Sequence, residues 1–348
     1  MTEANLIAFF ENVNDAYRRA EKSVGGAIDR YYTIGDYTVR LRFAGSALIP
    51  CITPAFEHLA TRPTVSPALT VCLWDRASTG TALPRPPWSL DAYDVRGEIR
   101  GYTNGRIRAA FYLGVNVLCL FDTQRDLAFY CTLDASPEAF YQHSSPLLTI
   151  LSWWARTRGY QYLHSGAVGT SNGGVLLAGK GGSGKSTAAL ACINSDLLYA
   201  GDDYCLLATD PSFHVYSLYN SGKLEADQMQ KFPHLLPAIN NIENLGVEKA
   251  IVFLQQSYPN KLATGFPVRA VLTPRITARP ETCLVPLSPS AALRALAPST
   301  LFQLSGTGRS EFETMADFIK RMPCYVLEMG TDLERIPQVI SDFLMTCS

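Results

Sequence analysis

Hydrophobic residues in the first part of the chain recur with the spacing of a helix and then with that of strands. Over residues 4–22 the apolar positions follow a period near 3.6 residues, which predicts an amphipathic helix. These positions are Leu6, Ile7, Phe9, Phe10, Val13 and Tyr17. From about Tyr31 onward, β-branched and aromatic runs are separated by Gly, Asp and Asn, as is typical of strands joined by turns. We expect strands within 31–45, 68–76, 106–122 and 127–133, and therefore a β-rich α+β domain over residues 1–150.

The pattern changes again in the second part of the chain. A serine and a proline at Ser145 and Pro146 precede an apolar stripe, which predicts a helix over 144–160 with the domain junction near it. The elements expected next are a strand over 162–169, a strand over 174–179, a helix over 185–195 and a strand over 197–201. This order is typical of an α/β domain, which we place at residues 151–348. Farther along, 301–312 is expected to be a loop and 332–346 a last helix.

The composition of the chain favours a soluble protein over nucleic-acid-binding and membrane proteins. The chain has 348 residues, which suits about two domains, and its 47% hydrophobic and 18% charged residues are ordinary for a soluble protein. A net charge of −1 without basic clusters argues against nucleic-acid binding. Apolar runs fall short of the roughly 18 residues that span a bilayer, and no signal peptide is recognisable. Nine cysteines without paired spacing are expected to be reduced, so we expect a cytoplasmic protein that does not enter membranes.

The most specific motif is a glycine-rich stretch, "GKGGSGKS", that matches the phosphate-loop pattern G-x-x-x-x-G-K-[ST] in full. Its residues, with the threonine that follows, are Gly179, Lys180, Gly181, Gly182, Ser183, Gly184, Lys185, Ser186 and Thr187. Glycines let backbone N–H groups turn toward phosphate oxygens, Lys185 can reach the β- and γ-phosphates, and Ser186 can bind Mg²⁺. The expected strand before the loop and helix after it favour a phosphate site over a chance glycine turn.

Two acidic residues follow the next expected strand. Asp202 and Asp203 come 17 and 18 positions after Lys185, at the strand's carboxyl end, where α/β folds bind ligands. One carboxylate can hold a metal ion while the other acts as a base, although Gly-Asp-Asp is also an ordinary turn sequence. His164 is expected on the preceding strand, either as a hydrogen-bonded structural residue or as part of the site.

The stretch "LLAGKGGSGKSTAALACINSDLLYAGDD" resembles the nucleotide-binding core of HPr kinase/phosphorylase. The likeness covers about 160–205 and extends to the ATP-dependent phosphoenolpyruvate carboxykinases. It implies a P-loop fold of this kind in the C-terminal domain, with ATP and Mg²⁺ as cofactors. It further implies that Asp202 is the general base, that Asp203 is a metal partner beside Ser186, and that His164 lies near the metal or the phosphate.

Beyond this stretch the chain departs from the family. The later Glu-Ile-Arg-Gly signature is absent, and "SLYNSGKL" stands in its place, where Lys223 is either a basic phosphate contact or a solvated surface lysine. The arrangement is more similar to stand-alone HPr-kinase-like proteins, some of which phosphorylate a serine of a lasso peptide.

These observations predict a kinase that transfers the γ-phosphoryl group of ATP to a hydroxyl of a peptide, protein or small molecule. The domain over 1–150 is expected to help choose that acceptor. The alternative is a nucleotide-dependent ATPase or regulatory switch, although the motifs typical of ATP hydrolases and of guanine-binding proteins are absent. A carboxykinase proper is a third alternative, for which the chain is short. The acceptor, the use of pyrophosphate, a phosphorylase activity and the number of subunits stay open, with a homo-oligomer among the alternatives.

Overall fold

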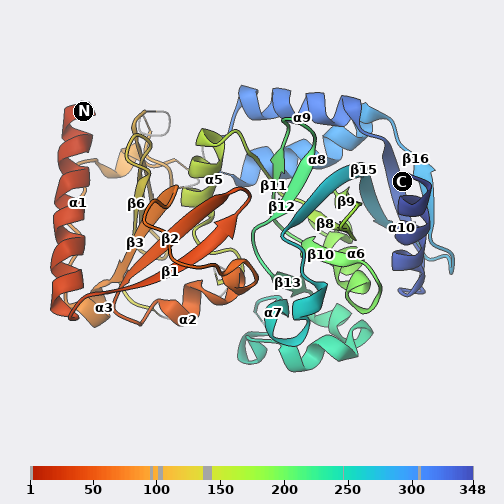
Figure 1. Cartoon of the computed structure of the whole chain (residues 1–348), viewed down its shortest axis with the longest axis horizontal. Coiled ribbons are helices and arrows are strands. Elements are labelled where there is room, and N and C mark those ends of the chain that lie inside the picture. The colour runs from red at the N-terminus through yellow and green to blue at the C-terminus, as the bar shows by residue number, and fades with distance from the viewer. Residues whose placement is uncertain are drawn as a thin grey trace. The chain divides into compact units, whose positions relative to one another are not determined.

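The computed structural model describes residues 3–94, 97–100, 105–135, 143–245, 247–304 and 307–347, and its fold is mixed α/β with several sheets. The chain forms two compact units (Figure 1). The first consists of Met1–Pro54, Leu59–Arg158 and Leu304–Gly306; the second consists of Ala55–His58, Gly159–Gln303 and Thr307–Ser348.

The first unit contains a six-stranded sheet in the order β1-β2-β3-β6-β5-β4. Its strands are β1 (Ala27–Ile34), β2 (Tyr37–Ala44), β3 (Leu69–Asp75), β4 (Ile107–Tyr112), β5 (Val117–Asp122) and β6 (Leu127–Thr132). The pairs β2–β3 and β3–β6 are parallel and the others are antiparallel. All six strands lie within the runs that the sequence predicts as strands or directly beside them.

The helices of the first unit are α1 (Glu3–Ser23), α2 (Ile49–Ile52), α3 (Arg76–Thr79), α5 (Leu148–Thr157) and the 3₁₀ turn η2 (Leu90–Ala92). Of these, α1, α3 and α5 pack against strands of the sheet. The 3₁₀ turn η1 (Pro54–Leu59) belongs mostly to the second unit, which includes Ala55–His58. The stripe predicted on α1 is confirmed, because Phe10, Val13 and Tyr17 are buried in one cluster with strand residues.

The expected start of the helix near the junction is wrong. Helix α5 begins at Leu148 after Leu147, which has a left-handed backbone (φ 59°), so neither Ser145 nor Pro146 caps it. Trp154 Nε1 donates to the Ala68 carbonyl oxygen at 3.2 Å and ties the helix to the first unit. The chain therefore passes into the second unit at Arg158–Gly159, whereas the sequence places the boundary between 150 and 151.

The second unit contains a nine-stranded sheet, with the path β10-β8-β9-β15-β12-β11-β7 and with β17 and β16 added beside β15. Its strands are β7 (Gln161–Leu163), β8 (Gly166–Thr170), β9 (Gly173–Leu177), β10 (Leu198–Gly201), β11 (Cys205–Ala208), β12 (His214–Ser217), β15 (Gly265–Ile276), β16 (Cys283–Pro286) and β17 (Cys324–Met329). A separate two-stranded sheet pairs β13 (Ser221–Leu224) with β14 (Ala250–Phe253).

Alternation along the central strands gives this sheet two buried faces. Val175 and Leu177 of β9 lie in one core cluster with α6 (Lys185–Ala191) and α10 (Arg335–Thr346). Leu176, between them, lies in a second cluster with α8 (Pro289–Gln303) and α9 (Arg309–Arg321). Because successive strand residues point to opposite faces, helices cover both sides of the sheet, as in α/β folds.

The remaining short elements of the second unit lie between these strands. They are η4 (Cys192–Asn194), η5 (Ala226–Lys231), η6 (Pro233–Ala238), η7 (Ile242–Asn244), α7 (Leu254–Ser257) and η8 (Pro259–Lys261). The helix expected over 185–195 thus ends earlier, at Ala191, and continues as a 3₁₀ turn. The loop expected over 301–312 is shorter, because α8 extends to Gln303 and α9 begins at Arg309. The last helix is confirmed as α10.

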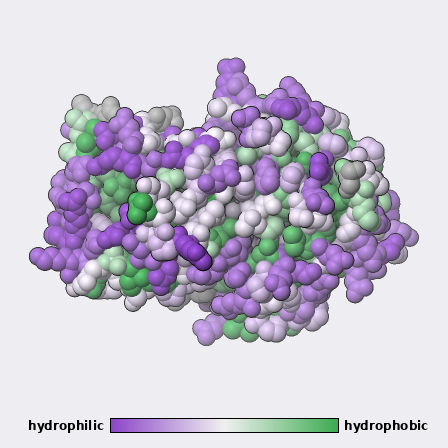
Figure 2. Space-filling model, viewed as in Figure 1, coloured by the Kyte–Doolittle hydropathy of each residue, from purple (hydrophilic) through white to green (hydrophobic). Residues whose placement is uncertain are grey.

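Among the described residues, no helix is long and apolar enough to cross a membrane. The face seen in Figure 2 is mostly hydrophilic or intermediate in character, and its hydrophobic residues form only small groups.

Candidate functional site

The glycine-rich loop joins β9 to α6 in the second unit. Strand β9 ends at Leu177, and α6 begins at Lys185 directly after Gly184. Gly182 and Gly184 have positive φ angles of 76° and 100°, which glycine adopts without strain. A methyl group on Gly179 would overlap Ser183 Oγ, so the loop folds back on itself closely. The expected order of strand, loop and helix is therefore present around residues 179–186.

Strand directions bring the histidine and the two aspartates to the same edge of the sheet. Strand β8 is antiparallel to both β9 and β10, so its beginning lies beside the ends of those two strands. His164 lies just before β8, and Asp202 and Asp203 follow the end of β10. The expectation that His164 lies on a strand is wrong, because the predicted strand is broken into β7 and β8 at this residue.

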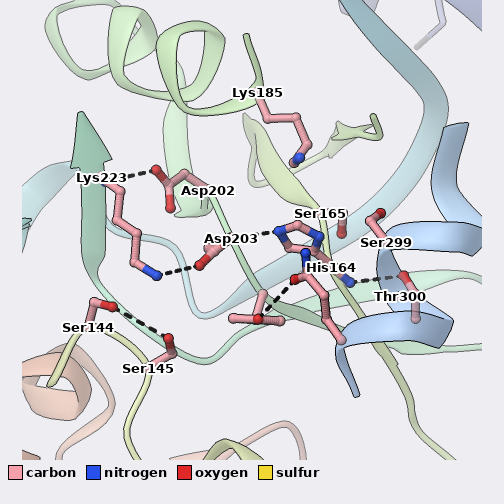
Figure 3. Close-up of polar contacts among 12 residues, drawn as sticks. Ser144, Ser145, His164, Ser165, Lys185, Asp202, Asp203, Lys223, Ser299 and Thr300 are labelled. Carbon is pink, nitrogen blue, oxygen red and sulfur yellow. Dashed lines mark hydrogen bonds and ion pairs between the residues drawn. The ribbon is translucent and has the colours of Figure 1, made fainter. Parts of the chain in front are cut away.

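Asp203 binds two donors through its two oxygens (Figure 3). His164 Nε2 lies 2.7 Å from Oδ1, and Lys223 Nζ lies 2.7 Å from Oδ2. A nitrogen facing a carboxylate carries the proton, which leaves Nδ1 of a neutral His164 as an acceptor. Burial alone would raise the pKa of Asp203, but the Lys223 ammonium and the His164 hydrogen bond outweigh burial and hold this pKa well below its usual range.

Asp202 is in a different environment. Its side chain is buried, and its Oδ2 accepts the Lys223 backbone N–H at 3.0 Å (Figure 3). Burial, followed by the negative charge of Asp203, raises the pKa of Asp202 to about 6, although the Lys223 N–H, the Lys223 ammonium and the nearby Ser186 hydroxyl lower it. The neighbouring carboxylates thus differ in charge at mildly acidic pH, as is common where acid–base roles are divided.

Lys185 reaches back over the loop that precedes it. Its Nζ donates to the Gly179 carbonyl oxygen at 2.7 Å and lies 3.4 Å from that of Lys180. Burial lowers the pKa of this lysine, whereas the charges of Asp203 and Asp202 raise it. The Lys185 side chain thereby lies against the beginning of the loop, and Figure 3 shows its ammonium group pointing toward the region of His164 and Asp203.

Four buried polar atoms around this edge have no hydrogen-bond partner among the residues that the structure describes. They are Asp202 Oδ1, His164 Nδ1, Ser165 Oγ and Ser183 Oγ. Buried polar atoms in folded proteins are normally paired with protein, water or a ligand. Their clustering beside the glycine-rich loop fits a site that takes a polar, charged ligand.

Residues with oxygen atoms that could take part in holding a magnesium ion also lie at this edge of the sheet. In the described part of the chain, no group of three or more His, Cys, Asp or Glu side chains is arranged to hold a metal ion. Mg²⁺ is usually bound by one or two carboxylates together with phosphate oxygens and water. Ser186, Asp202 and Asp203 are the residues here that could supply such ligands.

The structure thus brings the predicted site residues together. Lys223, which the sequence offered only as an alternative to a surface lysine, contacts both aspartates from β13. Two further residues at the site, Thr300 and Ser165, were missed by sequence reasoning. Thr300 Oγ1 lies 3.1 Å from the His164 backbone N–H, which it accepts, across a separation of 136 residues. Ser165 directly follows His164. Neither Thr300 nor Ser165 belongs to a recognisable motif, so no signal in the sequence could have identified them.

No protein-family model matches the sequence, and no curated protein is similar to it. One solved structure that resembles it is the Hpr(Ser) kinase/phosphatase from Coxiella burnetii, with 11% sequence identity. The similarity covers 53% of this chain and 97% of that chain, with a TM-score of 0.31. A likeness of this size is too low to assign an activity, so the function has to be inferred from the geometry of the site itself.

Proposed function

We propose that the second unit is an ATP-dependent kinase that transfers a phosphoryl group to a hydroxyl of a peptide, protein or small molecule. The observation that carries this proposal is the buried Asp202 carboxylate, whose Oδ1 has no partner among the described residues, with the Ser186 hydroxyl of the first turn of α6 nearby. A buried carboxylate in this state is stabilised by a cation or by a proton donor.

Each residue then has a physical role. The N–H groups of residues 179–186 and the Lys185 ammonium bind phosphate oxygens, and Lys185 must leave the Gly179 carbonyl to do so. Bound Mg·ATP would supply the transferable phosphoryl group and the metal charge that makes its transfer easier. Asp202 accepts the proton of the acceptor hydroxyl, and its pKa of about 6 suits a base that works near neutral pH.

Asp203 and Ser186 are assigned to the metal ion, with His164 and Lys223 orienting the Asp203 carboxylate. The position of Ser186 next to Asp202 also supports a second division of roles, in which Asp202 and Ser186 hold the metal together. Phosphoryl transfer needs both a metal site and a group that orients the nucleophile, so either division is compatible with kinase chemistry.

The experiment that tests the proposal follows the label of γ-³²P-ATP in the presence of Mg²⁺ and an array of serine-containing peptides. We expect slow release of labelled phosphate alone and faster transfer to one class of peptide. Lys185→Ala should abolish both, while Lys320→Ala, a change at an exposed lysine of α9, should abolish neither. Fast phosphate release that no acceptor alters, and that Lys185→Ala removes, would instead identify the ATPase or switch.

A further inference from the structure

A short segment from the early part of the chain belongs to the second unit. Residues Ala55–His58 lie in η1, which comes between β2 and β3 in the sequence, yet they group with residues of the second unit. Ala55 and Phe56 are buried there. The contacts of this 55–58 segment lead to the residues on either side of the aspartate pair.

The 55–58 segment is held by Asn220, the residue just before β13. The Asn220 backbone N–H and its Nδ2 both donate to the Ala55 carbonyl oxygen, at 2.9 and 3.0 Å. The Asn220 carbonyl oxygen accepts the Leu254 N–H at 3.0 Å, and its Oδ1 accepts the Gln255 N–H at 3.3 Å. Asn220 is fully buried, so this one residue joins three segments that are distant in the sequence.

His58 adds a second link between the same parts of the chain. Its Nε2 lies 2.7 Å from Ser217 Oγ, and its Nδ1 lies 3.4 Å from Asn220 Nδ2. Burial lowers the pKa of His58 to about 3, so the ring is neutral near pH 7, with Nδ1 as the acceptor and the proton on Nε2. A serine beside a histidine can act as a nucleophile, but Ser217 is only 1% exposed, so the pair serves as a structural link.

The position of Lys223 on the aspartates depends on how the beginning of β13 is held. Strand β13 pairs only with β14, and a two-stranded sheet by itself is marginally stable. Two contacts fix the strand where it begins. Asn220 binds the 55–58 segment, and Tyr199 Oη donates to the Ser221 carbonyl oxygen at 2.6 Å. Lys223 follows three residues after Asn220, so these contacts set where its N–H and its ammonium lie.

The 55–58 segment also supports the other donor to Asp203. The Phe56 and Tyr219 rings pack with their centroids 5.3 Å apart, and the Tyr219 and Tyr162 hydroxyls lie 2.9 Å apart. Tyr162 belongs to β7 and comes two residues before His164. Both donors to Asp203 (Figure 3) are thus two or three residues from a position that the 55–58 segment supports.

We propose that the 55–58 segment and Asn220 position the phosphoryl-transfer site, by holding β13 so that Lys223 keeps its bonds to both aspartates. Asn220 lies in "SLYNSGKL", so the inference gives this stretch a role besides that of Lys223. The effect on Lys223 follows from the contacts alone. The effect on nucleotide binding rests on the proposed function, because it assumes that the aspartates act on Mg·ATP.

The first test is a double-mutant cycle of Asn220→Ala and Lys223→Met, measured by urea unfolding of the full chain without nucleotide. The destabilisation caused by Lys223→Met should fall to about half or less in the Asn220→Ala background, because the lysine has already lost its position. Ile340→Ala is the matched control. This residue is buried in α10 of the same unit, so its loss should lower stability without altering the effect of Lys223→Met.

The second test is calorimetry with two probes, Mg·ATP and ATP in the presence of EDTA. Asn220→Ala should weaken Mg·ATP binding by about 10-fold, the lower end of the range for residues that orient a metal ligand. Binding of metal-free ATP should change little, because the 55–58 segment acts on the aspartates and not on the loop that binds phosphates. Ile340→Ala should change neither affinity.

Additive effects of Asn220→Ala and Lys223→Met would overturn the inference. An equal loss of the Lys223→Met effect in the Ile340→Ala background would also overturn it, because it would indicate general loosening of the unit. Equal weakening of ATP binding with and without Mg²⁺ would show that Asn220 acts on the phosphate loop instead.

The inference and the proposed function fail in distinguishable ways. If the unaltered protein binds neither probe, the proposed function fails, while the double-mutant cycle still decides whether Asn220 positions Lys223. Should Asn220→Ala not fold, His58→Ala takes its place in both tests, because His58 lies in the 55–58 segment and contacts Asn220. Additivity of His58→Ala with Lys223→Met would then refute the inference.

Discussion

Lys223 Nζ lies 2.7 Å from Asp203 Oδ2, although 20 residues separate them in the chain. The same lysine uses its backbone N–H to bind Asp202 Oδ2, so one residue of β13 holds both carboxylates. Its ammonium stabilises the charge of Asp203, which is largely buried, and its backbone bond orients Asp202.

Replacing Lys223 by methionine should therefore lower the free energy of unfolding by about 1–3 kcal/mol at pH 7, the usual range for a charged hydrogen bond. Lys249→Met is the control, because Lys249 and Glu225 form an exposed ion pair that should contribute at most about 1 kcal/mol. Urea unfolding measures both changes.

The effect of Lys223→Met should depend on pH. A carboxyl group whose pKa is depressed in the folded state stabilises the protein above its unfolded pKa of about 3.9 and loses that contribution as the pH falls. The difference between the unaltered protein and the variant should thus be full above about pH 4 and shrink below it. A difference that stays constant from pH 7 to pH 3 would contradict the charge pairing.

Asp202 should show the opposite behaviour, because its pKa is raised to about 6 in the folded state. Between about pH 4 and pH 6 the folded protein binds a proton that the unfolded chain has released, so this group lowers stability as the pH rises. Asp202→Asn should therefore stabilise the protein by about 1–3 kcal/mol at pH 7.5 and have little effect at pH 4. Thermal or urea unfolding at the two pH values tests this, and a variant that is less stable at pH 7.5 would refute it.

Amide substitutions should also separate the roles of the two aspartates. If Asp202 is the base, Asp202→Asn should slow transfer to a confirmed acceptor by about 10²- to 10⁴-fold while Mg·ATP affinity is nearly kept. Asp203→Asn should weaken Mg·ATP binding. The reverse outcome, with metal-dependent binding lost in Asp202→Asn, would assign Asp202 and Ser186 to the metal ion. Near-normal transfer rates in both variants would exclude the pair from catalysis.

Gly184 should tolerate a side chain poorly. Its φ of 100° is unfavourable for alanine, and a methyl group there would overlap Met329 Cε. Gly184→Ala should lower the free energy of unfolding by about 1–3 kcal/mol. Gly181→Ala is the control within the same loop, because a methyl group at that position meets nothing within 4 Å. Equal melting temperatures for the two variants would contradict the close packing of the loop on β15 and β17.

The sequence by itself determined the features that depend on local spacing. The apolar positions of α1 recur at the period of a helix, and the β-branched runs of β1 to β6 alternate with turn residues, so both were readable without a structure. The loop after β9 was readable for the same reason, since a phosphate loop is contiguous in the chain.

Only the tertiary structure decided how distant residues meet. The antiparallel register of β8 with β10 places His164 beside Asp203. The position of β13 next to the end of β10 makes Lys223, a candidate surface lysine in the sequence, the partner of both aspartates. Ile276 lies 92 positions after Gly184 in the sequence, yet it touches the loop, because β15 is parallel to β9. The order and direction of strands depend on which faces can be buried together across the whole domain, and a pattern of neighbouring residues does not contain that information.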